Sequence, residues 1–184
     1  MLLSLWKRFR RSERGSISAE FAVSITVIIA LLTGGVEFGR YVLVRQKLDR
    51  AATTASDLVA RNDRISTAQL GNVFNSTKEV MTPYDFGANG LVIISMVTQT
   101  NGVDTIVWQR SGGGTFTKTS VVGSEGDAAT LPEGFILRDG ESVVIAEVHY
   151  RYLPMILGNF LGQTDVYHIA YFRPRFGATV PLDP

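Results

Sequence analysis

The stretch Gly15-Ser-Ile-Ser-Ala-Glu20-Phe21 decides the fold, together with the apolar run over residues 22–36 and the Glu37-Phe-Gly-Arg40 that follows it. The apolar part, residues 17–38, is 22 residues long. As a helix it extends about 33 Å, which is enough to cross a bilayer core of about 30 Å. We therefore predict a single retained transmembrane helix at residues 17–38.

The positive charge of the chain is concentrated in a basic leader at residues 1–15. This leader holds five basic residues against Glu13, a net charge of +4, whereas the whole chain of 184 residues carries +1. The remaining residues therefore carry −3, which excludes a basic nucleic-acid footprint on the rest of the chain. The five basic residues are Lys7, Arg8, Arg10, Arg11 and Arg14.

A basic leader before an apolar run is also typical of a cleaved signal peptide. Against that interpretation, the run is long enough to cross a membrane, and no small-x-small cleavage site follows it. Five basic residues precede the predicted span, and four follow it, at positions 40, 45, 47 and 50. This small difference favours a cytoplasmic N-terminus and a C-terminal domain outside the membrane.

Glu20 is an acidic residue near the start of the predicted span, where an ionised carboxylate is costly unless it is paired or kept at the interface. One interpretation is that Glu20 reaches the headgroups or is protonated. The other starts from a cut after Gly15, which creates a new ammonium group at Ser16. That ammonium lies close to Glu20 in helix geometry and can pair with it on the same helix or on a packed neighbour.

Gly15-Ser-Ile-Ser-Ala-Glu20-Phe21 resembles the processing site of type IV prepilins, in which cleavage follows the glycine and a glutamate is fifth in the mature chain. The longer pattern over residues 12–61 is similar to the TadE-like proteins of tight-adherence (Tad) pili. The first mature residue is Ser16, whereas type IV pilins commonly begin with phenylalanine, so N-methylation is not carried over. The longer pattern comprises Arg14-Gly15, Ala19-Glu20-Phe21-Ala22, Gly35-Val36-Glu37-Phe38-Gly39-Arg40, Gln46 and Ala51-Ala52.

This resemblance implies a minor pseudopilin that takes part in assembly of a Tad-type pilus, a cell-adhesion structure. It implies an anchor in the bacterial inner membrane, a cut by a dedicated prepilin peptidase between Gly15 and Ser16, and packing with other pilins, within the pilus or during its assembly. It assigns assembly and charge pairing to Glu20 and Phe21.

Gly35 and Gly39 form a G-x-x-x-G pair, which lets helices approach closely in membranes. Together with Gly34, these glycines are equally compatible with a flexible or kinked point near the interface. We place Glu37 at the outer headgroup level beside Arg40 and assign it no special role.

The helical pattern continues past the span. Apolar residues from Tyr41 to Val59 recur at three- and four-residue steps, and no proline occurs between residues 16 and 64. We therefore expect one helix over residues 16–61, its first half in lipid or in a bundle of like helices. Its second half would cover a folded domain. A transmembrane helix followed by a separate juxtamembrane helix is the alternative.

For residues 62–184 we predict a small exported α+β domain with an antiparallel sheet and a pilin-like arrangement. Ser66 is the expected N-cap of a helix at 66–81, and Asn101-Gly102 the expected turn of a hairpin. Strands are expected at 91–97, 103–109, 142–152 and 166–173, and residues 111–134 are loop-like. We interpret the face of strand 142–152 that carries Glu147 and His149 as a solvated charged face.

The domain offers little for catalysis. The chain has no cysteine, which removes disulfides and thiolate chemistry. Residues 112–119 end in Lys118-Thr119 but have Thr117 where a phosphate-binding loop needs its last glycine. Glu147, His149 and His168 would form a zinc site only if their strands placed them together.

We therefore predict no enzyme activity, no cofactor, no metal ligands, and no nucleic-acid or small-molecule partner. Two alternatives remain open. One is an uncleaved single-pass membrane scaffold protein. The other is a membrane-anchored metal- or ligand-binding domain that uses His149 and His168.

Overall fold

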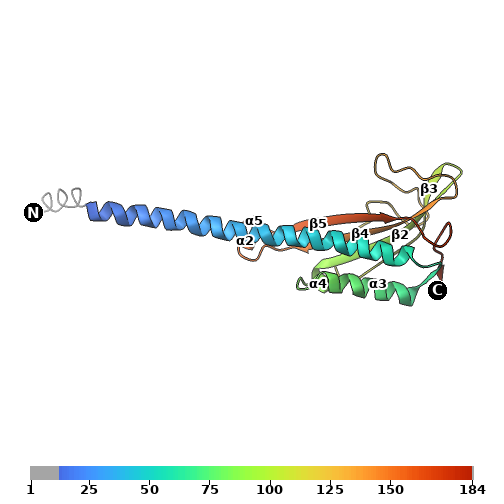
Figure 1. Ribbon diagram of the computed structural model, residues 1–184, viewed down its shortest axis with the longest axis horizontal. Coiled ribbons are helices and arrows are strands. Elements are labelled where there is room, and N and C mark those ends of the chain that lie inside the picture. The colour runs from blue at the N-terminus through green and yellow to red at the C-terminus, as the bar shows by residue number, and fades with distance from the viewer. Residues whose placement is uncertain (1–12, 184) are drawn as a thin grey trace, which may run out of the picture. The chain divides into compact units, whose positions relative to one another are not determined.

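The computed structural model describes residues 13–183, so the first twelve residues of the predicted leader lie outside the described residues. In chain order, a long helix is followed by shorter helices and then by a series of strands (Figure 1). They are α2 (Glu13–Ala60), β1 (Ile65–Ser66), α3 (Thr67–Val80), α4 (Phe86–Asn89), β2 (Gly90–Thr100), β3 (Val103–Gly112), β4 (Ser142–Tyr152), α5 (Gly158–Leu161), β5 (Thr164–Phe172) and β6 (Leu182–Asp183). This confirms the predicted α+β fold, a long N-terminal helix followed by a small antiparallel-sheet domain.

The long helix is continuous. Every residue of α2 from Glu13 to Ala60 is helical, including Gly34 and Gly35. The interrupted helix that these glycines made conceivable is therefore not found. No proline interrupts α2, so no helical hydrogen bond is lost. Alanine, frequent in its second half, does not crowd the preceding turn and is the best helix former.

The described chain divides into two compact units. The first comprises residues up to Arg40 together with Pro154–Gly162, the connection that contains α5. In this connection α5 ends at Leu161, and its C-cap Gly162 has φ of +68°, a positive value that glycine adopts without strain.

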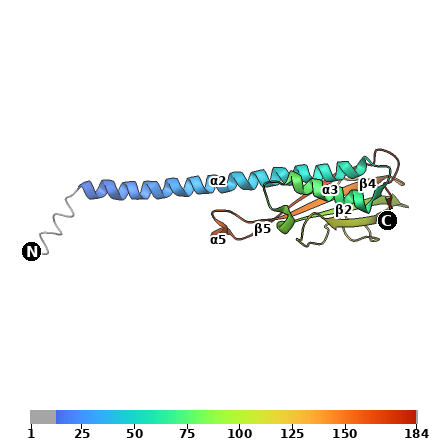
Figure 2. The ribbon, with the colours of Figure 1, turned by 90° about the horizontal axis from the view of Figure 1, so that it is seen from below.

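The second unit comprises the remaining residues and contains a four-stranded sheet in the order β3-β2-β4-β5, with every pair antiparallel. The central strands β2 and β4 are buried on both faces because structure covers each side. Residues 41–60 of α2 and the helix α3 cover one face of the sheet (Figure 2). The core beneath them includes Val44, Leu48, Ala51, Ala55, Val92, Ile94, Met96, Val144, Ala146 and Val148.

Two local predictions about this unit are confirmed. Ser66 is the N-cap of α3, where it accepts a hydrogen bond from the backbone N–H of Gln69, and the Gln69 side chain accepts one from the backbone N–H of Ser66. This reciprocal arrangement satisfies two donors at the start of the helix. Asn101 and Gly102 form the β2–β3 turn with φ of 53° and 80°, the positive values that a two-residue hairpin turn requires.

The other face of the sheet is covered by the long connection between β3 and β4. Its side chains Val122 and Leu137 are buried against Ile106, Val143 and Ile145. This segment lacks regular helices and strands, so its apolar residues follow no period in the sequence. The sheet is therefore enclosed on both sides.

Candidate functional site

The first half of α2 presents an apolar surface that is exposed throughout residues 17–32. Its large side chains are exposed, at 68% for Phe21, 71% for Leu31 and 70% for Phe38. By length and composition this helix is long and apolar enough to cross a membrane. Transfer of one such side chain from water to an apolar environment is favourable by about 1.5–3 kcal/mol. The surface is therefore expected to be covered by lipid or by other helices.

The residues assigned to processing and pairing lie at the start of this helix. Gly15 and Ser16 are helical residues near the first described residue of α2, Glu13. Glu20 and Phe21 follow on the exposed part of the helix. Ser16 and Glu20 are four residues apart, a spacing that places them on the same helix face.

The glycines Gly35 and Gly39 lie on an open part of the helix. A Cβ atom added at either position, or at Gly34, would meet no described atom within 4 Å apart from its chain neighbours and the backbone of the surrounding helical turns. Both lie two residues from Glu37, and at about 100° per residue they lie on the side of the helix opposite to it. The space that a close helix contact needs is therefore unoccupied on that side.

Glu37 binds the connection between β4 and β5, contrary to our expectation that it has no special role. Its side chain is 5% exposed, and its two carboxylate oxygens accept hydrogen bonds from the backbone N–H groups of Met155, at 3.1 Å, and Ile156, at 2.9 Å. Arg40, one turn further, donates to Met155 Sδ at 3.1 Å. A carboxylate at the end of an apolar run is thus stabilised by two charge-assisted hydrogen bonds.

Sequence reasoning missed this role because the two donors are backbone groups 118 and 119 residues away. The available signal was the position of Glu37 itself. An acidic residue at either end of a membrane-length apolar run is costly unless it has a partner, and this holds for Glu37 as it does for Glu20.

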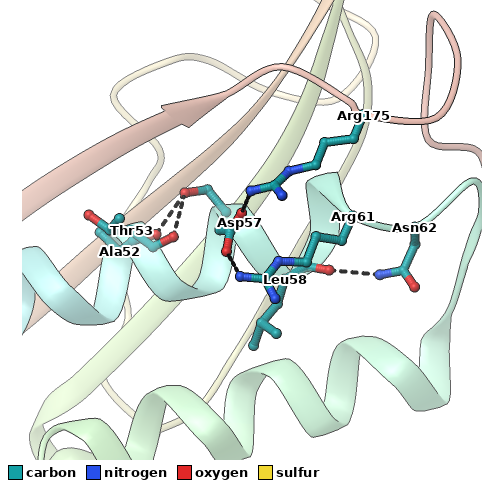
Figure 3. Close-up of polar contacts among 8 residues, drawn as sticks. Ala52, Thr53, Asp57, Leu58, Arg61, Asn62 and Arg175 are labelled. Atoms are coloured by element: carbon teal, nitrogen blue, oxygen red, sulfur yellow. Dashed lines mark hydrogen bonds and ion pairs between the residues drawn. The ribbon is translucent and has the colours of Figure 1, made fainter.

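The end of α2 is fixed to the C-terminal segment by Asp57 (Figure 3). Its carboxylate accepts hydrogen bonds from Arg61, one turn later, and from Arg175 Nη2 at 2.5 Å. The backbone N–H of Arg175 also donates to the Ala60 carbonyl at 2.9 Å. Hydrogen bonding with Arg61 holds the pKa of Asp57 below its usual value, against a smaller opposing effect of burial.

The charged face of β4 is buried, and our interpretation of it as solvated is wrong. Glu147 is completely buried beneath the β3–β4 connection, where it accepts hydrogen bonds from the Ser120 hydroxyl, from the Val121 N–H at 2.8 Å and from the Tyr167 hydroxyl at 3.0 Å. Burial raises the pKa of Tyr167, with a further contribution from Glu147. A buried carboxylate with three donors is a structural anchor for the connection that covers it.

The two histidines of the metal-site alternative lie on opposite faces of the sheet. In the β4–β5 register His149 is opposite Tyr167 and His168 is opposite Val148, so the two side chains point to different sides. His168 Nε2 lies 2.8 Å from Asp49 Oδ1, whereas His149 is 7% exposed and packs on Tyr167. Burial lowers the pKa of His149. The register therefore separates the ligands that this alternative requires.

Lys118, which suggested the phosphate-loop interpretation, forms an ion pair with Asp165 at 2.7 Å. The residues from 113 to 141 contain no helix that could follow a phosphate-binding loop. The geometry gives this segment a covering role over the sheet.

Comparison with known proteins gives one family. Residues 15–57 match the model of the family described as TadE-like protein, which confirms the resemblance over this segment. No curated protein and no solved structure matches the chain significantly. The family is one of pilus components and not of enzymes, and with a helix able to cross a membrane the match fits a Tad pilus-associated protein.

Proposed function

We propose that this chain is a minor pseudopilin that enters assembly of a Tad-type pilus through α2. The observation that carries the proposal is the coincidence of the family match, residues 15–57, with the helix whose apolar first half the described chain leaves uncovered. Such a surface is stable in lipid before assembly and between like helices after it. The function therefore consists of burial and charge pairing.

In this proposal the N-terminus is cytoplasmic and the domain formed by residues 62–184 is exported across the inner membrane. A prepilin peptidase cuts between Gly15 and Ser16, in the first turn of α2. The new Ser16 ammonium then pairs with Glu20 of its own helix or of a neighbour, a charge-assisted contact that lowers the cost of a carboxylate near hydrocarbon. Phe21 adds apolar contact beside this pair.

The second half of α2 keeps the exported domain attached during this transfer. Val44, Leu48 and Ala51 are fully buried in the domain core, so the helix cannot leave the domain without exposing apolar surface. The helix is therefore both the anchor and a structural part of the domain.

Expression of the chain with and without an active prepilin peptidase tests the processing step. We expect a shorter product that begins at Ser16, by intact mass and N-terminal sequencing, only when the peptidase is present. A Gly15→Leu variant is the matched control and should stay uncut. An unchanged mass in the presence of the peptidase would instead support the uncleaved single-pass scaffold protein.

A further inference from the structure

We propose that the connection Pro154–Gly162 is a second membrane contact of this protein, a loop whose apolar tip enters the lipid interface beside α2. The inference rests on the proposed membrane anchoring of α2 and goes beyond it, because it assigns a lipid partner to a segment outside the family match.

The first observation is the composition and exposure of the loop. Residues 153–163 contain no charged side chain. Met155 is 63% exposed, Ile156 42% and Phe160 86%. Apolar side chains gathered at one loop tip without charges among them mark a surface that leaves water.

The second observation is the position of the loop along the helix. Glu37 is the last but one residue of the predicted span, and its carboxylate binds the N–H groups of Met155 and Ile156. Glu37 and the loop belong to the same compact unit. The loop is therefore held at the level where α2 leaves the hydrocarbon, the depth at which amphipathic segments insert by about 5–10 Å.

The third observation is how the loop satisfies its backbone. Pro154 has no N–H, Met155 and Ile156 donate to Glu37, Phe160 donates to the Leu157 carbonyl at 2.9 Å, and Gly162 to the Gly158 carbonyl at 3.1 Å. Unsatisfied N–H groups are costly at a lipid interface and harmless in water. The pairing of these N–H groups favours lipid as the occupant over open solvent.

Because the chain contains no cysteine, single cysteines can report the surroundings of chosen positions. The full chain is reconstituted in vesicles of phosphatidylcholine and phosphatidylglycerol, with a nitrobenzoxadiazole label at one of three positions. Asn159→Cys places the label on the loop and leaves Phe160 intact. Leu31→Cys reports on the membrane span, and Val103→Cys is the reference for an exposed site of the sheet.

We expect lipid-borne spin labels to quench the fluorescence at positions 159 and 31, and aqueous iodide to quench position 103 several-fold more strongly than position 159. Phe160→Asp, at a highly exposed position, should restore iodide quenching at 159 and leave 31 unchanged. Glu37→Gln should do the same in smaller measure, because an amide offers one acceptor oxygen to the two N–H groups.

The three positions separate failure of this inference from failure of the anchoring it rests on. Lipid quenching at 31 with iodide access at 159 equal to that at 103 would overturn the loop contact alone. A label at 31 that iodide reaches would overturn the anchoring and the loop contact together. Protection at 159 from both lipid and iodide quenchers would show that protein, such as a second copy of this chain, covers the loop, and would also overturn the proposal.

Discussion

The carboxylate of Asp57 joins Arg175, 118 residues later in the chain, to the last turns of α2, with 2.5 Å between Oδ1 and Nη2. The Asp57 side chain is 15% exposed, so this ion pair is less screened than a pair in open water. Together with the bond from the Arg175 N–H to the Ala60 carbonyl, it fixes the C-terminal segment to the end of the helix.

We predict a measurable coupling between these two residues. In a double-mutant cycle with Asp57→Asn and Arg175→Gln, the coupling free energy of unfolding should be about 0.5–1 kcal/mol, the upper part of the range for partly exposed pairs. Urea unfolding of the full chain in detergent measures it through Trp108, which is buried, in a Trp6→Phe background. Arg64, which pairs with Asp183 at 3.6 Å with both side chains more exposed, is the matched control and should show weaker coupling.

Acidification should destabilise the domain in two separate steps. Burial lowers the pKa of His149, so below its ordinary value of 6.5 the unfolded chain binds a proton that the folded chain does not, and the free energy of unfolding falls. Asp57 also has a lowered pKa, and its contribution is lost only as the pH falls below 3.8 towards the lower folded value. His149→Phe should remove the first step and leave the second. If the free energy of unfolding of the His149→Phe variant fell between pH 7 and pH 5 as much as that of the wild type, the prediction would be contradicted.

Replacement of Glu147 should loosen the connection that covers the sheet. Glu147→Leu leaves the Ser120 hydroxyl, the Val121 N–H and the Tyr167 hydroxyl without their acceptor, at a cost of about 2–4 kcal/mol. Tyr167→Phe removes a single donor and should cost about 1 kcal/mol. Urea unfolding gives both values, and limited proteolysis should cut residues 113–141 faster in Glu147→Leu. Equal protease resistance in the variant and the wild type would show that Glu147 does not hold this connection.

The elements with strong local signals were predictable from the sequence. The strand expected at 142–152 is β4, Ser142–Tyr152, because β-branched residues begin it, apolar and polar residues alternate from Ala146 to Tyr152, and a proline follows soon after. Ser66 and the Asn101-Gly102 turn were predictable for the same reason, since each acts on neighbours a few residues away.

What the sequence could not reveal depends on distant partners. Glu37 binds backbone groups about 118 residues away, which carry no side-chain signature. The burial of Glu147 depends on a connection whose apolar residues follow no period. The separation of His149 from His168 follows from the β4–β5 register, which strand patterns alone leave open.

The glycine face of α2 should matter for association and not for folding. Gly35→Leu with Gly39→Leu fills space that is open within the chain, so the domain should fold normally. Close helix contact should be weakened, because two leucine side chains keep the helix backbones apart. Gly34→Leu adds one leucine side chain at a position about 100° round the helix from Gly35, and it is the matched control. Pilus yield and crosslinking in membranes measure the effect, and loss of assembly in Gly34→Leu alone would place the contact on another face.

Glu20 should act after processing. Glu20→Gln keeps Gly15 and Ser16, so the peptidase should still produce a chain that begins at Ser16. The neutral amide cannot form the charge-assisted pair with the Ser16 ammonium. Loss of this pair, at about 1.5–3 kcal/mol, corresponds to at least about a tenfold fall in incorporation of the chain into pili. Glu20→Asp keeps the charge and should retain part of the incorporation into pili. N-terminal sequencing and the amount of sheared pilus separate the two steps. If Glu20→Gln forms pili at the wild-type level, the pairing with Ser16 is not what drives assembly.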